Sequence, residues 1–187
     1  LKGDKIHGIN VTVPFKKMII PFLDVLSNEA RTSQSVNTIY KEKNKIIGDN
    51  TDIEGFKTSL ELTNQTIKDK KAFILGAGGV VSSIIIALKK MGISKIYLSN
   101  RTELKAQELK KNFPEIEIIE WGKVVDFDII INATSIGLNI KDEINIDYEN
   151  ISQNKFFYDV IYNPKETYFL KKAKEFGAQT ENGKMMF

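Results

Sequence analysis

Lys16 and Asp52 carry opposite charges, and each stands where the sequence predicts that a helix begins. Lys16 ends the stretch NVTVPFK, in which an alternating strand breaks at Pro14. Asp52 ends GDNTD, directly after Thr51, a residue type favoured at helix N-caps. A cation in the first turn of a helix gains nothing from the helix dipole, so Lys16 needs another reason to be there. The two residues could meet in one cleft, as an ammonium group beside a carboxylate.

Such a pair suits the reduction of a ketone. A hydride reaches the carbonyl carbon, and the ammonium group gives a proton to the oxygen. A neighbouring carboxylate favours the charged ammonium, which helps the reductive direction. We therefore predict that Lys16 donates the proton and that Asp52 pairs with it and holds a substrate hydroxyl. Taken alone, Lys16 could instead be a solvated surface lysine, and Asp52 could be a charge that only favours the start of its helix.

A glycine-rich segment, GAGGVV at residues 76–81, follows the apolar run KAFIL and precedes a helical pattern. A Rossmann unit has its dinucleotide-binding loop at this point. Gly76 permits the tight turn, Gly78 lets the backbone approach a pyrophosphate, and the helix N-terminus supplies unpaired N–H groups. Val81 replaces the usual third small residue, so the helix and strand are expected slightly farther apart. The segment predicts a nucleotide site; the alternative is a glycine-rich connection that binds nothing.

The end of the next predicted strand, SNRTELK, indicates which dinucleotide is bound. NAD sites usually have a carboxylate here for the ribose 2′-hydroxyl, and this chain has none at the strand tip. Cationic and polar side chains suited to a 2′-phosphate stand there instead: Asn100, Arg101, Thr102 and Lys105. NADP is therefore favoured over NAD. The alternative is that Thr102 only caps the next helix while Arg101 and Lys105 are solvated.

The order of apolar runs predicts an α/β fold. From about residue 71, runs of four or five apolar residues alternate with amphipathic segments, which is typical of βαβ units on a doubly wound, Rossmann-like parallel sheet. The polar segment NATSIG, at 132–137, follows one of these strands.

The first residues differ, with a strand at GINVTVP and a hairpin turning near Lys43 and Asn44. We predict part of a smaller α/β substrate domain at 1–55 and an NADP domain at 56–187, joined by a helix that opens with a Thr51/Glu54 capping box.

Composition excludes several classes of function. The net charge of the 187 residues is +3 and is spread over the chain, so nucleic acid is a poor candidate partner. No apolar run approaches the roughly 20 residues of a membrane-spanning helix. The chain has no cysteine and one histidine, His7, which argues against disulfides and metal sites and fits a cytoplasmic protein. His7 and Trp121 are given no role, and Met185 and Met186 are expected to pack in a core rather than line a nicotinamide pocket.

Taken together, the motifs resemble shikimate dehydrogenase, the NADPH-dependent family that reduces 3-dehydroshikimate to shikimate in aromatic amino-acid biosynthesis. NVTVPFK, SVNT, GDNTD, GAGG, NRT, NATS, YDVIY and NG follow the family's order along nearly the whole chain. The resemblance implies that Lys16 and Asp52 are the catalytic pair and that Thr12, Asn37, Asp52 and Tyr162 contact the substrate. It also implies an NADP site made by Gly76, Ala77, Gly78, Gly79, Val80, Asn100, Arg101, Thr102, Lys105, Thr134, Ser135, Val160 and Gly183.

Departures from the family pattern limit what the resemblance implies. A serine-rich motif that grips the substrate carboxylate would precede Leu1, and a glutamine would follow Phe187, so we expect a chain truncated at both ends. An arginine common after the glycine loop is replaced near Val81 and Ser82. Two other functions stay open: an NAD-preferring quinate/shikimate dehydrogenase, and a catalytically silent nucleotide-binding regulatory protein. A small-molecule substrate is the expected partner, and a homodimer is compatible with the sequence.

Overall fold

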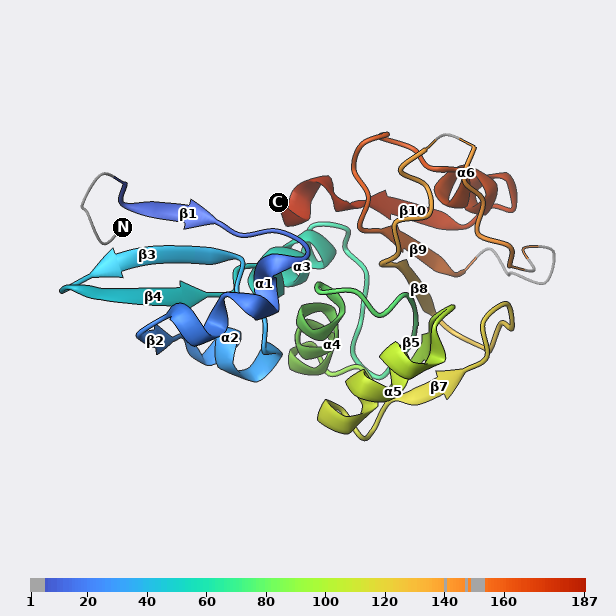
Figure 1. Ribbon diagram of the computed structural model, residues 1–187. Coiled ribbons are helices and arrows are strands. Elements are labelled where there is room, and N and C mark those ends of the chain that lie inside the picture. Colours follow the sequence, from blue (N-terminus) through green and yellow to red (C-terminus); the bar gives the residue numbers. More distant parts are fainter. Residues whose placement is uncertain (1–5, 140, 147, 149–153) are drawn as a thin grey trace.

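The computed structural model describes residues 6–139, 141–146, 148 and 154–187 and contains two β-sheets (Figure 1). The larger sheet has six strands, all parallel, in the order β10-β9-β8-β5-β6-β7. Its strands are β5 (Lys71–Leu75), β6 (Lys95–Ser99), β7 (Glu117–Ile119), β8 (Ile129–Asn132), β9 (Phe156–Asp159) and β10 (Gln179–Asn182). The chain runs outward from β5 through β6 to β7, returns to β8 on the other side of β5, and continues outward. This doubly wound topology confirms the predicted fold class, although β10 was not predicted.

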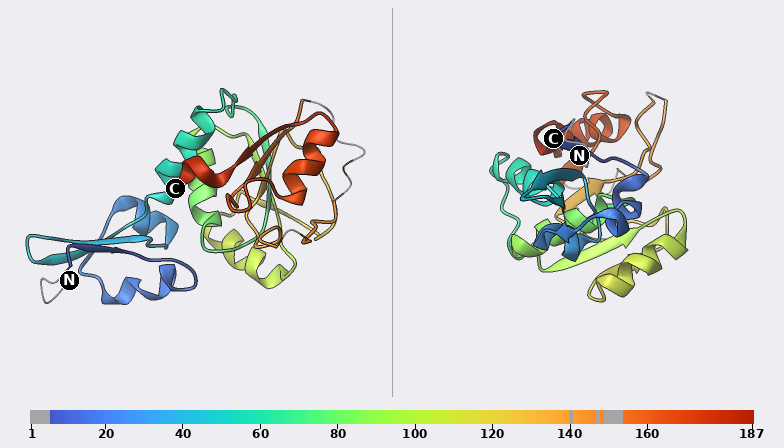
Figure 2. Two further views of the ribbon diagram at one scale, coloured as in Figure 1. Left: turned by 90° about the horizontal axis from the view of Figure 1, so that it is seen from above. Right: turned by 60° about the vertical axis from the view of Figure 1, so that its left-hand side comes forward.

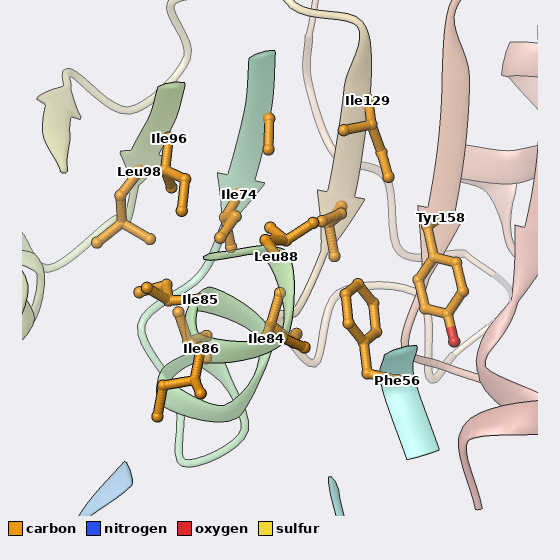
Figure 3. Packing of buried hydrophobic residues seen from close by; sticks show 14 of the residues in the cluster. Phe56, Ile74, Ile84, Ile85, Ile86, Leu88, Ile96, Leu98, Ile129 and Tyr158 are labelled. Atoms are coloured by element: carbon orange, nitrogen blue, oxygen red, sulfur yellow. The ribbon is translucent and has the colours of Figure 1, made fainter. Parts of the chain in front are cut away.

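Helices cover both faces of the larger sheet because its strands alternate apolar residues between the two faces. Ala72 and Ile74 face the cluster that contains α3 (Asp52–Glu61), α4 (Val81–Lys90) and part of α5 (Glu103–Asn112). Phe73 and Leu75 face the opposite cluster, which contains α6 (Tyr168–Glu175). Figure 3 shows the α4 side, where isoleucines of the helix pack on the strands.

The junction between the sheets is closed by α3 and the C-terminal turn η2 (Gly183–Met186), which pack together (Figure 2). Phe56 of α3 meets the ring of Tyr158 edge-on, with ring centroids 5.0 Å apart, and the Ser59 hydroxyl lies 2.7 Å from the Tyr158 hydroxyl. Met186 is buried in the same core, while Met185 is exposed. The predicted core packing therefore holds for Met186 alone.

The smaller sheet lies beside the larger one, not stacked on it (Figure 2), and has the order β1-β3-β4-β2. Its elements are β1 (Gly8–Asn10), α1 (Phe15–Met18), η1 (Ile20–Phe22), β2 (Val25–Leu26), α2 (Asn28–Ser33), β3 (Thr38–Glu42) and β4 (Lys45–Asp49). The β3–β4 hairpin turns as predicted, since Lys43 and Asn44 have φ angles of 46° and 65°. Two successive positive φ angles are typical of a type I′ turn. A small core of Ala30, Val36, Ile39 and Ile46 supports the sheet.

Three details differ from the sequence-based expectations. The first strand ends at Asn10, so Thr12 lies in the following loop, and Pro14 occupies the N-cap of α1 rather than its first turn. The capping box is absent: Thr51 has helical backbone angles, and its N–H and hydroxyl both donate to Asn37 Oδ1. An N-cap side chain needs an extended backbone to reach the helix N–H groups. The predicted boundary after residue 55 falls inside α3 and stays a prediction.

No helix in the described part of the chain is long and apolar enough to cross a membrane.

Candidate active site

Lys16 and Asp52, 36 residues apart in the sequence, form an ion pair in the structure. The Nζ atom of Lys16 lies 2.6 Å from Oδ2 of Asp52, and Asn37 donates from Nδ2 to the other oxygen, Oδ1, at 2.7 Å. The Asp52 side chain is 2% exposed and the Lys16 side chain 12% exposed. Both carboxylate oxygens are thus occupied, which fixes the ammonium group in place.

The smaller sheet and its short helices hold this pair. Lys16 lies in the single turn α1, whose position is fixed because Val36 N donates to Lys16 O at 2.8 Å. Asp52 is the first residue of α3, and its N–H donates to Oδ1 of Asn50 at 3.1 Å. A single helical turn has little dipole of its own, so the Asp52 carboxylate is the dominant charge next to Lys16.

Asn50 is a buried residue that the sequence reasoning did not assign. Its Nδ2 donates to Ser33 Oγ at 3.1 Å and to Ser35 O at 2.9 Å, while Ser83 Oγ of α4 donates to its Oδ1 at 3.2 Å. Asn50 thereby links the smaller sheet to α4 and to the backbone of Asp52. Ser35 adds a second link, since its hydroxyl lies 3.3 Å from the Gly79 carbonyl oxygen of the glycine loop.

A cavity of about 900 Å³ lies at the carboxyl ends of the larger sheet's strands and reaches Lys16. Most of the predicted site residues line it: Thr12, Lys16, Gly76, Ala77, Gly78, Gly79, Val80, Asn100, Arg101, Thr102, Lys105, Thr134, Ser135, Val160 and Tyr162. Three do not. Asn37 and Asp52 lie behind Lys16, and Gly183 packs on the backbone of Val160, where an added Cβ would meet the carbonyl oxygen at 2.1 Å.

The strand order arranges the cavity lining from one end to the other. Trp121 follows β7, residues 100–105 follow β6, residues 76–80 follow β5, and the loops after β8 and β9 complete the row. Neighbouring strands lie about 4.8 Å apart, so the row from β7 to β9 covers roughly 19 Å. An extended dinucleotide fits this length, with the glycine loop at its middle.

The lining suits an anionic dinucleotide. Gly76 has a φ angle of 111°, and a Cβ there would lie 2.7 Å from the Ala133 carbonyl oxygen, whereas Gly79 has open space on the Cβ side. The helix α4 begins directly behind the loop, and no side chain caps it. The described lining residues include Lys16, Arg101 and Lys105 but no carboxylate. Close backbone approach and positive charge are what a pyrophosphate and a 2′-phosphate require.

Comparisons with known proteins agree with this geometry. Residues 59–167 match the family model described as shikimate / quinate 5-dehydrogenase, and residues 1–39 match the shikimate dehydrogenase substrate binding domain. A Pelagibacter ubique protein named shikimate dehydrogenase (NADP(+)) is 76% identical over all 187 residues, which span 71% of its length. The chain belongs to the shikimate dehydrogenase family.

Solved structures of the family have the same fold. The shikimate dehydrogenase of Aquifex aeolicus is 43% identical with a TM-score of 0.91, and the match covers 99% of this chain and 69% of that one. A shikimate dehydrogenase solved in complex with NADP+ is 38% identical with a TM-score of 0.92, over 99% of this chain and 68% of that one. The prediction of an NADP-dependent dehydrogenase is therefore confirmed.

Several lining residues of this shikimate dehydrogenase family member were not predicted. They are Val13, Trp121, Ala133, Ile136, Leu138, Ile161, Asn163 and Phe187. Val13, Ala133, Ile136 and Ile161 lie inside the quoted motifs, but an apolar side chain gave no reason to choose them over core residues. Phe187 packs against the ring of Tyr162, with centroids 5.5 Å apart. Met185 and Met186 do not line the cavity.

Asp159, the buried carboxylate of YDVIY, ties together the two loops that follow β8 and β9. Its Oδ1 accepts hydrogen bonds from Asn132 Nδ2 at 3.0 Å and from Ile161 N at 2.9 Å, and its Oδ2 accepts one from Thr167 Oγ1 at 2.6 Å. Burial raises the pKa of Asp159 to about 6, against the lowering effect of these three donors. Both loops reach the cavity, at Thr134 and at Val160.

The raised pKa predicts a pH-dependent stability. Between pH 4 and 6 the folded chain binds more protons at Asp159 than the unfolded chain, so this residue's contribution to stability falls as the pH rises. A difference of about two pKa units corresponds to roughly 3 kcal/mol. The unfolding free energy of Asp159→Asn minus that of wild type should therefore increase by about this amount from pH 4 to pH 7. Urea denaturation at each pH measures both free energies.

Asp126→Asn serves as the control. Hydrogen bonds from Lys71 and Lys155 lower the pKa of this exposed carboxyl, so its stabilising effect is lost only as the pH falls below its ordinary pKa of 3.8. Between pH 4 and 7 the difference in unfolding free energy between Asp126→Asn and wild type should therefore stay nearly constant. Parallel curves for Asp159→Asn and wild type across this range would contradict the assignment.

Proposed function

We propose that the chain acts as a shikimate dehydrogenase in which Lys16 donates the proton when 3-dehydroshikimate is reduced to shikimate with NADPH. The observation that carries the proposal is the 2.6 Å contact between Lys16 Nζ and a buried Asp52, at one wall of the cavity that also holds the glycine loop. A cytoplasmic location and a homodimeric assembly accompany the proposal as predictions.

Bound NADPH supplies the hydride. The Lys16 ammonium donates a proton to the oxygen that becomes the hydroxyl, and the resulting amine regains a proton from solvent. In the oxidative direction the neutral amine accepts the hydroxyl proton. Asp52 directs the ammonium, because Asn37 holds its second oxygen and prevents rotation of the carboxylate. Removing an oriented proton donor typically costs 10²–10⁴-fold in rate.

Substrate contacts are proposed for the residues around Lys16. Thr12, in the loop before α1, and Tyr162, in the loop after β9, both line the cavity that Lys16 reaches. Both side chains are exposed there and offer hydroxyl groups, and Tyr162 is 52% exposed. Hydroxyl groups of this kind can orient the hydroxyls of a cyclic polyol. Asn37 and Asp52 do not line the cavity but hold the Lys16 ammonium group, and their substrate contacts stay a prediction.

For the cofactor, Arg101 and Lys105 are proposed to hold the 2′-phosphate and the residues at 76–80 the pyrophosphate. The quinate alternative keeps one supporting observation, since the matching family model is described for both shikimate and quinate. An NAD-preferring enzyme would be expected to have a carboxylate after β6, where this chain has Asn100, Arg101 and Thr102.

Lys16→Ala should lower kcat for 3-dehydroshikimate reduction by a factor on the order of 10² or more while leaving NADPH binding intact. Turnover is followed by NADPH absorbance, and binding by calorimetry. Lys17→Ala is the matched control, because Lys17 is exposed, does not line the cavity and carries the same charge. The proposal fails if the two variants keep similar turnover, or if the wild-type chain carries out no reduction.

Arg101→Ala should weaken NADP binding about 10- to 100-fold and leave NAD binding nearly unchanged, since a charge-assisted hydrogen bond is worth about 1.5–3 kcal/mol. Lys111→Ala, in the last turn of α5, the helix that follows Arg101 in the chain, removes a cation that does not line the cavity. Calorimetric titration of both dinucleotides separates the effects. An equal loss for NADP and NAD would show that Arg101 does not recognise the 2′-phosphate.

A further inference from the structure

The cavity extends beyond the proposed 2′-phosphate site to β7, the edge strand of the larger sheet. Trp121, which follows β7, is the lining residue at this end. Arg101 and Lys105 come next along the row, then the glycine loop, then the loops beside Lys16. A dinucleotide whose 2′-phosphate meets Arg101 and whose pyrophosphate meets the glycine loop therefore places its adenine near Trp121.

Trp121 is held in place before any ligand arrives. It occupies the second position of a turn in which Lys123 N donates to Glu120 O at 3.1 Å, and the Lys123 Nζ and Glu120 Oε2 atoms are 2.7 Å apart. Gly122 follows with a φ angle of 92°, the left-handed conformation that the third position of a type II turn requires. Part of the indole packs against the core cluster on the α6 face of the sheet. Contact with a ligand would therefore cost little conformational entropy.

The indole is half-buried, with core on one side and the cavity on another. Packing alone would explain an apolar residue here, as it does for Ile119, which packs against the same cluster without lining the cavity. What distinguishes Trp121 is a large aromatic surface at the β7 end of the cavity, next to the cationic residues that follow β6. Purine rings bind to such surfaces through their π-faces.

We propose that Trp121 is a binding residue for the adenine ring of NADP, in contact with the base through its indole. This inference rests on the proposed cofactor site. It assigns the chain's single tryptophan to the adenosine end of the ligand, far from the hydride-transfer end. Trp121 thus contributes to cofactor affinity and not to the chemical step.

Because the chain has one tryptophan, its fluorescence reports on Trp121 alone. The probe is adenosine 2′,5′-bisphosphate, which carries the adenine and the 2′-phosphate but does not absorb where tryptophan emits, so quenching requires contact. Saturating the wild-type chain should quench and shift the emission. Oxidised nicotinamide mononucleotide, which lacks adenine and also does not absorb where tryptophan emits, is the ligand control. Unchanged emission at a saturation proved by calorimetry would overturn the inference.

Variants supply a second, independent readout. Trp121→Ala should weaken calorimetric binding of adenosine 2′,5′-bisphosphate about tenfold, since one base–aromatic contact is worth about 1–3 kcal/mol. Trp121→Phe keeps an aromatic surface and should restore most of the affinity. Ile119→Ala, the structural control, should lower stability without changing affinity. Equal binding by Trp121→Ala and wild type, or equal losses in Trp121→Ala and Ile119→Ala, would contradict the inference.

Kinetics separate this inference from the proposed function. For Trp121→Ala we expect a higher KM for NADPH with kcat nearly unchanged. If wild type turns over but the fluorescence and binding tests fail, the Trp121 inference is wrong and the proposed function stands. If wild type binds adenosine 2′,5′-bisphosphate with quenching but reduces no 3-dehydroshikimate, the proposed catalytic role of Lys16 fails and the adenine contact stands.

Discussion

The ion pair between Lys16 and Asp52 is the interaction on which the proposed site depends. A buried carboxylate without its partner costs about 3–5 kcal/mol, so α1, which carries the cation, and α3, which carries the anion, are held at a fixed separation. Asn37, from the segment before β3, satisfies the second carboxylate oxygen. Three segments distant in the sequence therefore share one constraint, which fixes the Lys16 ammonium group at the wall of the cavity.

The larger sheet supplies the other half of the site through its topology. From β5 to β7 each new strand is added on one side of β5, and from β8 onward on its other side, so the switch point of the topology lies between β5 and β8. The loops after these two strands lead in opposite directions and leave a crevice at the carboxyl edge. The glycine loop after β5 stands at its centre. Asn50 then relates the crevice to the ion pair, because it contacts both Ser83 of α4 and the backbone of Asp52. Through these buried hydrogen bonds, α4 with the glycine loop before it is fixed relative to the Lys16–Asp52 ion pair.

Sequence reasoning succeeded where one local pattern determines one structure. The runs KAFIL, KIYLS and FDIIINAT became central strands, and Lys43-Asn44 formed the hairpin turn, since periodicity and turn chemistry act over a few residues. It failed where distant partners decide. The Thr51/Glu54 capping box did not form, because Thr51 donates its hydrogen bonds to Asn37 instead. The polar strand β10 forms because it pairs with β9, and Trp121 reaches the cavity because β7 lies beside β6. Their predicted places at two helix starts first suggested Lys16 and Asp52 as a pair, and the motif resemblance then supported it.

A double-mutant cycle tests the central claim most directly. The kcat for 3-dehydroshikimate reduction is measured for wild type, Lys16→Met, Asp52→Asn and the double variant, with NADPH binding verified in each. If the two side chains act as one proton-donating unit, the double variant is about as slow as the slower single variant. Losses that multiply would show two independent contributions, and the account of a carboxylate directing the ammonium would then be wrong.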